Sequence, residues 1–149
     1  MSDPIIIKQV LTELRDISKE KRRMAVMKLG MMGGDQAVRA LMSTVSNEYE
    51  DLIVRGRAAL MLGKLGDTRA VDPLIRALDA PGFQTPINAA QALGMLGDQR
   101  AIPPLLAFAI AGKDKTRDVA LEALQRLGYT AEDMESLFPQ QTRQEPEAT

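Results

Sequence analysis

The segment AALMLGKLGDTRAVDPL, residues 58–74, decides the fold because it occurs more than once in the chain. A second copy, AAQALGMLGDQRAIPPL, covers residues 89–105 and starts 31 residues after the first, with no gap between the two patterns. AVMKLGMMGGDQAVRAL at residues 25–41 is a third copy, and ALEALQRLG at residues 120–128 is half of a fourth. A period of this length is typical of proteins built from stacked pairs of helices.

Within each copy the apolar residues have helical spacing, and a glycine ends the pattern. Ala58, Leu62 and Leu65 fall on one side of a helix. Gly66 can then supply the left-handed conformation that follows a helix, and Asp67 can cap the next helix by accepting backbone N–H bonds. Each copy therefore predicts the end of one helix and the start of another.

Pro73 and Pro104 occupy equivalent positions about two turns into the helices that follow. Because proline lacks an N–H and its ring clashes with the preceding turn, we expect each to kink its helix or to divide a short first turn from the main body. The first helices of the pairs are predicted at residues 3–18, 35–46, 67–79 and 98–112, the second helices at 19–32, 51–65, 85–96 and 113–127, and a closing helix at 130–138.

A single pair of helices is too thin to bury its own apolar stripe, so neighbouring pairs must stack. The sequence predicts an all-α fold, a right-handed α–α superhelix of about four helix pairs with a C-terminal capping helix, as one domain over residues 1–138. Residues 139–149, PQQTRQEPEAT, contain two prolines and almost nothing apolar, and are predicted to be a disordered tail.

The composition excludes several classes of chemistry. The chain has no Cys and no His, so disulfides, thiolate metal sites and the commonest general base are absent. We find no nucleophile with a base, no paired carboxylates and no phosphate-binding loop, since the glycines near residues 30–34 follow a helix where that loop would need a strand. We therefore expect a protein that is not an enzyme, with no catalytic residue, metal site or cofactor.

Charge and hydropathy also limit the partners. The net charge of −1 gives no broad attraction to nucleic acid or to an anionic membrane. The segment 15–28 is locally basic, but only 3% of the residues are aromatic, so a solvated helix end is favoured over a nucleic-acid site. The longest apolar run, residues 105–111, is too short to span a membrane, and no signal segment opens the sequence, which predicts a cytoplasmic protein.

The string VRGRAALMLGKLGDTRAVDPLIRAL, residues 54–78, resembles the HEAT-like repeat of phycobilisome lyase subunits, V-R-x-x-A-A-x-A-L-G-x-L-G-D-x-x-A-V-x-x-L. The resemblance covers residues 21–128. That family contains bilin lyase subunits and also many scaffold and adaptor proteins, so the resemblance implies a fold and a binding role. Its arginine is matched by Arg22, Arg55 and Arg117, which we expect to form a ladder between repeats with acidic partners such as Asp67.

Two family positions vary along the chain. The third unit has Pro86 where the arginine is expected. The glycine in the middle of the second helix is matched by Gly30, Gly63 and Gly94, whereas the last unit has Gln125. Such divergence is typical of a terminal repeat that faces solvent.

The resemblance implies that partner contacts come from the variable positions of the second helices, which line the concave face. Carried over residue by residue, the predicted partner-binding residues are Arg23, Met24, Met27, Met31, Arg57, Leu60, Lys64, Ile87, Asn88, Gln91, Met95 and Glu122. Many of them are apolar, and Met24, Met27, Met31, Leu60, Ile87 and Met95 would together form an exposed patch. Such a patch could receive an apolar helix of a partner; the alternative is that several of these side chains pack as core against the next repeat.

Two functions follow as hypotheses. The first is a scaffold or adaptor that binds a partner protein through the concave face, with a homodimer closing over that face as an alternative. The second, implied by the resemblance alone, is a subunit or chaperone of a bilin lyase-like system that attaches chromophores to phycobiliproteins. Without Cys or His, the chain would need a second subunit for such chemistry.

Overall fold

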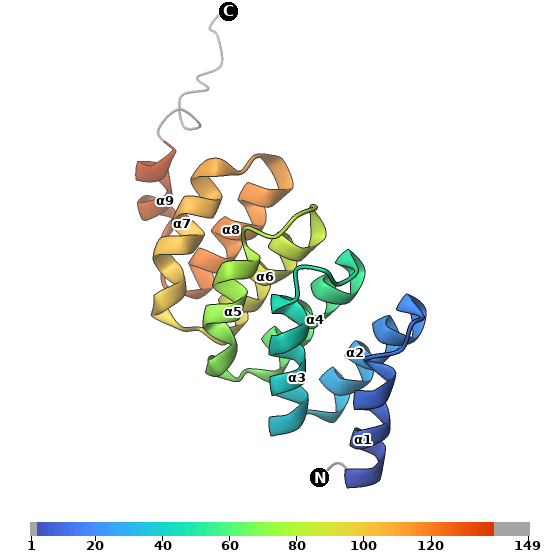
Figure 1. Ribbon diagram of the computed structural model, residues 1–149. Coiled ribbons are helices and arrows are strands. Elements are labelled where there is room, and N and C mark those ends of the chain that lie inside the picture. Colours follow the sequence, from blue (N-terminus) through green and yellow to red (C-terminus); the bar gives the residue numbers. More distant parts are fainter. Residues whose placement is uncertain (1–2, 139–149) are drawn as a thin grey trace, which may run out of the picture.

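Two rows of helices, laid side by side in chain order, make up the structure, a computed structural model that describes residues 3–138 (Figure 1). In chain order the elements are α1 (Pro4–Glu13), α2 (Lys19–Met32), α3 (Asp35–Ser46), α4 (Leu52–Leu65), η1 (Thr68–Ala70), α5 (Val71–Ala77), α6 (Gln84–Leu96), η2 (Gln99–Ala101), α7 (Ile102–Ala111), α8 (Asp114–Arg126) and α9 (Ala131–Leu137). The η elements are single 3₁₀ turns. No strand occurs between residues 3 and 138.

The second helices of the pairs, α2, α4, α6 and α8, form one row, and each packs on the next. The first helices form the other row, and α9 lies at the end of the stack beside α7 (Figure 1). The all-α solenoid of four pairs with a closing helix is therefore confirmed. The predicted tail, residues 139–149, lies outside the described residues.

The helix boundaries follow the local signals. Gly66 and Gly97 take left-handed conformations, with φ of 72° and 71°, at the ends of α4 and α6. Asp67 and Asp98 then cap the 3₁₀ turns η1 and η2 through their side chains. Each 3₁₀ turn precedes, as an element of its own, the α-helix that carries Pro73 or Pro104, so the predicted division of a short first turn from the main body is confirmed.

The end of α1 is the main error in the predicted boundaries, since the helix stops at Glu13, five residues before the expected end. The cause lies in the next helix. Arg22 of α2 donates hydrogen bonds from Nη1 to the carbonyl oxygens of Asp16 and Ile17, at 2.8 and 2.9 Å. These bonds hold the connecting segment as a turn, and Ser18 at its end caps α2.

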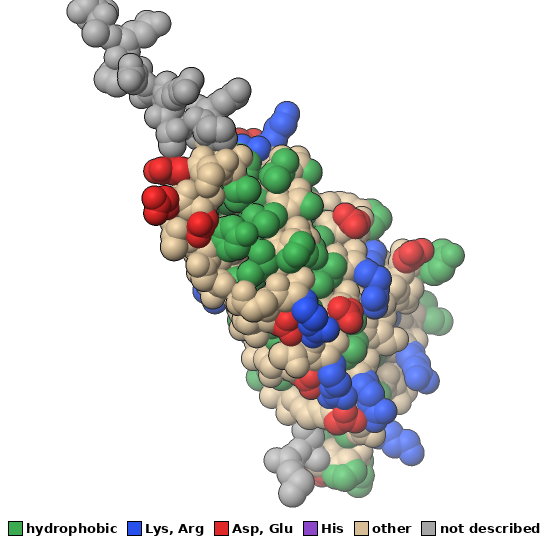
Figure 2. Space-filling model, turned by 90° about the vertical axis from the view of Figure 1, so that its left-hand side faces the viewer, with side chains coloured by type: hydrophobic (Ala, Val, Ile, Leu, Met, Phe, Trp, Pro, Cys, Tyr) green, Lys and Arg blue, Asp and Glu red, His purple; other side chains and the backbone are tan. Residues whose placement is uncertain are grey.

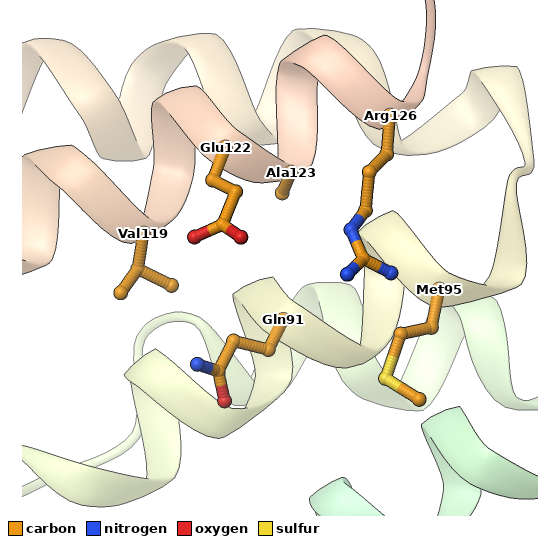
Figure 3. Close-up of a pocket in the computed structure, with 6 residues that line it drawn as sticks. All are labelled: Gln91, Met95, Val119, Glu122, Ala123 and Arg126. Carbon is orange, nitrogen blue, oxygen red and sulfur yellow. The ribbon is translucent and has the colours of Figure 1, made fainter.

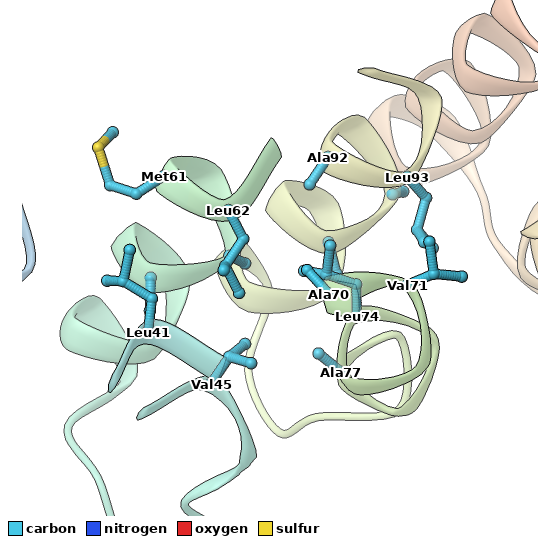
Figure 4. Packing of buried hydrophobic residues seen from close by; sticks show 14 of the residues in the cluster. Leu41, Val45, Met61, Leu62, Ala70, Val71, Leu74, Ala77, Ala92 and Leu93 are labelled. Carbon is cyan, nitrogen blue, oxygen red and sulfur yellow. The ribbon is translucent and has the colours of Figure 1, made fainter. Parts of the chain in front are cut away.

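The core lies between the two rows of helices. Leu41 of α3, Leu62 of α4, Leu74 of α5 and Leu93 of α6 are fully buried, and Figure 4 shows their side chains in one continuous layer with small alanines. Burying a leucine side chain contributes about 1.5–3 kcal/mol. Because this layer runs through successive pairs, each pair depends on its neighbours for stability.

Glycines in the middle of the second helices let the backbones of one row approach closely. A Cβ built on Gly63 would lie 2.7 Å from the Ala92 Cα, and one built on Gly94 would lie 2.9 Å from the Ala123 Cα. Gly30 packs in the same way on the Met61 side chain. Gln125, at the equivalent position of α8, is exposed, as expected for a helix on which no further helix pair packs within residues 3–138.

The first helices are farther apart than the second helices. Cavities open between α1 and α3, between α3 and α5, and between α5 and α7, whereas the second helices pack on one another more extensively. A solenoid whose inner row is closely spaced and whose outer row is open curves towards the inner row. The surface formed by α2, α4, α6 and α8 is therefore the concave face.

Candidate functional site

The predicted partner-binding residues all lie on the four helices of the concave face. Those with exposed side chains are Met24, Met31, Lys64, Gln91, Met95 and Glu122, and those that are half-buried are Arg23, Met27, Arg57 and Leu60. The structure therefore leaves most of this set available at the surface.

Ile87 and Asn88 are corrections, because both are buried at the first turns of α6. Ile87 is 1% exposed and belongs to the core. Asn88 is 8% exposed, its Nδ2 donates to the Gly56 carbonyl at 2.8 Å, and its Oδ1 accepts from Gln84 at 2.7 Å. Gly56 carries no side chain that would hold α6 away from α4, so this part of α6 packs inward.

The apolar side chains of the concave face divide into two groups by their exposure. Met24, Met31 and Met95 are 58%, 85% and 40% exposed. Met27 and Leu60 are half-buried and pack against the core. Both interpretations of the apolar patch therefore hold in part: its rim faces solvent, whereas its middle supports the contact between repeats.

Arg23 is held by a structural ion pair with Asp51. Its Nε and Nη2 donate to the two carboxylate oxygens at 2.9 and 3.1 Å. Asp51 also caps α4 by accepting from Val54 N. Hydrogen bonds from Arg23, followed by the bond from Val54 and the positive charges of Arg23 and Lys19, lower the pKa of Asp51 to about 2 against the cost of burial. Arg23 therefore joins the first two repeats and is not free to bind a partner.

Three other cations of the concave face have no such counterion. Arg57 is half-buried, Lys64 and Arg126 are exposed, and none of them forms an ion pair within residues 3–138. Arg57 and Lys64 lie on α4 and Arg126 lies on α8, the two helices that flank α6, which carries Met95. Their charges are available to a ligand.

A pocket of about 200 Å³ opens between α6 and α8 on this face (Figure 3). It is lined by Gln91, Met95, Val119, Glu122, Ala123 and Arg126. Figure 3 shows Glu122 and Arg126 of α8 extending towards α6, with Met95 below the guanidinium group. The pocket therefore combines a carboxylate, a guanidinium, an amide and apolar side chains, a set suited to binding.

Of the predicted ladder of family arginines, the arginine of the first repeat has an acidic partner in the next repeat, and Arg55 and Arg117 form no ion pair within residues 3–138. Arg22 pairs with Glu50 at 3.1 Å, whereas Arg55 donates to the Val45 carbonyl and Arg117 to the Ala109 carbonyl. Arg55 and Arg117 lie in the first turns of α4 and α8, where carbonyls near the end of the preceding helix accept their hydrogen bonds.

Asp67, the predicted acidic partner, belongs to a different chain of ion pairs. Arg69 bridges Asp67 and Asp35 of the preceding repeat, at 2.8 and 2.7 Å. Arg100 repeats the arrangement with Asp98, at 2.9 Å, and with Asp72 of the preceding repeat, at 3.7 Å. These pairs are partly exposed, so we assign them a minor role in stability.

An apolar surface on the outer row was not predicted. Ile75, Leu78, Pro104, Ala107 and Phe108 line a cavity of about 310 Å³ between α5 and α7. Figure 2 shows hydrophobic side chains gathered on this side of the molecule, next to a group of acidic ones. The sequence contained an indication of this apolar surface, since α7 has no charged residue along its whole length.

Residues 3–138 contain no group of three or more Asp, Glu, His or Cys side chains that could hold a metal ion. None of their helices combines the length and hydrophobicity that crossing a membrane requires.

A family model of HEAT repeats matches residues 7–85 and, in a second overlapping alignment, residues 51–125. The chain belongs to the HEAT-repeat family. Its helix pairs, glycine contacts and capping aspartates are thus the parts of a HEAT solenoid, and the predicted type of repeat is confirmed.

Among solved structures, this HEAT-repeat chain is similar to one chain in the complex of CpcE and CpcF of phycocyanin lyase from a Nostoc species. The two are 29% identical, with a TM-score of 0.70, over 85% of this chain and 55% of the Nostoc chain. The HEAT-repeat chain therefore spans about half the length of that relative. No curated protein sequence matches it.

Proposed function

We propose that this HEAT-repeat chain is a binding subunit that holds a partner protein on its concave face and performs no bond-making chemistry itself. One observation carries the proposal: exposed methionines share a face with cations that form no ion pair in the described part of the chain. Met31, at 85% exposed, and Met24, at 58%, contribute little to the core. Exposed apolar side chains of this kind mark interaction surfaces, and methionine adapts to varied partners.

The charges on this face define the chemistry of the partner. Arg57, Lys64 and Arg126 are positive, whereas Glu122 is the one acidic residue of the pocket between α6 and α8. A helix with an apolar side flanked by Asp or Glu would match both the methionines and the cations. The partner is therefore proposed to be acidic and amphipathic.

Site-specific photocrosslinking tests the location of the interface. A photoreactive residue placed at Met31 or Met95 should capture the partner in extracts of the native cell. The same residue placed at Ile110, which is 57% exposed on α7 of the outer row, is the matched control and should capture nothing. Equal capture from Ile110 and from Met31 would contradict the concave interface.

The likeness to a chain of the phycocyanin lyase complex favours a narrower form of this proposal. The HEAT-repeat chain would then be one subunit of a bilin lyase-like assembly, in which a second subunit completes the site. A linear tetrapyrrole presents an apolar conjugated body and two carboxylate groups. Met95 and Val119 would contact the body, and Arg126 would pair with a carboxylate.

Titration with phycocyanobilin tests the narrower form. Binding should change the absorbance spectrum of the bilin, and Arg126→Gln should weaken binding about tenfold, the loss of one charged contact. Arg39→Gln, an exposed arginine on α3 of the outer row, is the control. If the protein leaves the bilin spectrum unchanged, the bilin lyase-like proposal is contradicted, whereas the proposal of a protein-binding subunit is unaffected.

A further inference from the structure

Arg22 and Arg55 occupy the same position in successive repeats, but within residues 3–138 only Arg22 has a carboxylate partner. Arg22 Nε donates to Glu50 at 3.1 Å, and Glu50 lies just before α4, the second helix of the next repeat. The residue at the corresponding place before α6 is Pro81, 31 positions further on. The second repeat therefore keeps the arginine and lacks the acid that receives it.

The guanidinium group of Arg55 is only partly satisfied. Its Nε and Nη2 both donate to the Val45 carbonyl, at 3.2 and 3.0 Å. The residue is 5% exposed, and its Nη1 is buried with no hydrogen-bond partner within residues 3–138. Leaving a charged donor buried without an acceptor costs stability, and most such donors in proteins are paired.

The ion pair next to Arg22 and Glu50 is replaced at both positions in the following repeat. Arg23 and Asp51 bind each other across the first two repeats. The corresponding positions one repeat further on are Gly56 and Gly82, so donor and acceptor have been lost together and no charge is left unpaired. The retention of Arg55 without its carboxylate is thus a specific feature of this position.

Arg55 lines a cavity of about 510 Å³ that opens on the outer row between the ends of α3 and α5. Val45, Pro73, Ala77 and Ala80 supply apolar wall, and Arg76 adds a second cation that forms no ion pair in the described part of the chain. Glu48 and Asp79 also border the cavity, so an anion that enters meets two acids as well as two arginines. The lining thus carries no net charge, and the unpaired Nη1 of Arg55 beside the apolar wall is the feature that favours a single negative group on an apolar body.

We propose that this cavity binds a carboxylate carried on an apolar body, which takes the place that Glu50 takes beside Arg22. The carboxylate accepts hydrogen bonds from Arg55 and pairs with Arg76, and the apolar body lies along Pro73 and Ala77. A free organic acid and an acidic side chain of a bound protein both supply this group. Although Arg55 belongs to α4, the cavity opens on the outer row, away from the concave face, and the proposal is independent of the function proposed above.

Benzoate and benzamide are matched probes, because they share a ring and differ in charge. Benzoate should shift the Arg55 Nε–Hε resonance of the full chain and bind at least tenfold more tightly than benzamide. Equal binding of the two probes, or no shift of the Arg55 resonance with either, would overturn the proposal.

Two substitutions of Pro81 test the site without removing Arg55, whose loss could unfold the chain. Pro81→Glu should restore the internal carboxylate, raise the melting temperature without ligand and weaken benzoate binding at least tenfold. Pro81→Gln is the neutral control and should do neither. If Pro81→Gln weakens benzoate binding as much as Pro81→Glu does, charge is irrelevant and the proposal fails.

The source of the natural carboxylate is distinguished by native mass spectrometry of the protein purified from its own cell. A free acid appears as a small added mass, and a protein side chain as a bound subunit. In either case the added mass should be lost from Pro81→Glu and kept by Pro81→Gln. An added mass that Pro81→Glu retains would place the ligand elsewhere.

Discussion

Gly63 of α4 lies directly on the backbone of Ala92 of α6, so closely that a methyl group on Gly63 would sit 2.7 Å from the Ala92 Cα. A glycine inside a helix ordinarily costs about 1 kcal/mol relative to alanine. Its presence here is explained by the packing of two helix backbones, which sets the close spacing of the inner row. The contact thus links one missing side chain to the curvature of the solenoid.

Gly63→Ala should lower the free energy of unfolding by about 1–3 kcal/mol, although alanine is the better helix former. The added methyl group meets backbone, which cannot move without separating α4 from α6. Urea unfolding followed by circular dichroism measures the change. Gln125→Ala is the control at the equivalent position of α8, where the side chain is exposed, and should change stability by less than about 0.5 kcal/mol. A more stable Gly63→Ala protein would show that the spacing is not fixed by this glycine.

Asp51→Asn should remove a pH-dependent part of the stability. The pKa of Asp51 is about 2 in the folded protein and 3.8 for the free side chain, so the ion pair stabilises the fold above about pH 4 and is lost as the pH falls towards 2. Because the pair is partly solvated, we expect a loss of about 1 kcal/mol at pH 6, which shrinks as the pH falls through 2, where Asp51 is half ionised, and disappears only below that pH. Asparagine can still cap α4, so the substitution removes the charge and keeps the cap.

Arg23→Gln, which removes the other half of the ion pair, tests whether the effect of Asp51→Asn comes from that pair. It should show the same loss at pH 6, and the double variant should lose little more than either single variant, because both remove one interaction. Losses that add in full would mean that Arg23 and Asp51 act independently.

Asn88→Ala should destabilise the fold by about 1–2 kcal/mol and leave partner capture unchanged. The side chain joins α4 and α6 through its bond to the Gly56 carbonyl and is buried, so it supports the concave face without touching a ligand. Thermal unfolding and the photocrosslinking assay measure the two effects. Gln91→Ala, one turn further along α6 and exposed, should show the reverse: unchanged stability and weaker capture.

Phe138→Leu should loosen α9 at the end of the solenoid. The Arg117 guanidinium lies 4.4 Å from the centre of the Phe138 ring, a contact that contributes about 0.5–1 kcal/mol. Leucine keeps an apolar side chain but has no ring, so hydrogen exchange in α9 should become faster while the exchange of α4 and α6 stays the same. Phe138→Tyr, which keeps the ring, should exchange like the parent protein.

The helix boundaries that are set by residues close together in the sequence were predictable. Gly66 and Asp67 end one helix and begin the next through bonds that span a few residues, and Gly97 and Asp98 repeat them. The end of α1 was not predictable in this way, because Arg22 of the following helix determines it.

The concave face was predicted as a set of helix positions, and the structure decided which of them remain at the surface. Ile87 and Met95 both lie at variable positions of α6, yet Ile87 is 1% exposed and Met95 is 40% exposed. The difference comes from α4, where Gly56 lets the first turns of α6 approach. The sequence of α6 alone therefore could not predict that Ile87 is buried and Met95 is exposed.

The sequence by itself determined the repeat, the helices and their order, because helix periodicity, capping and glycine conformation act over a few residues. Only the tertiary structure decided which arginines are paired, which methionines are exposed and that Arg55 Nη1 has no acceptor within residues 3–138. Those features depend on side chains that approach each other from different repeats, about thirty residues apart in the chain. Burial and pairing are properties of two packed helices together, and the spacing between them is fixed only when the whole stack has formed.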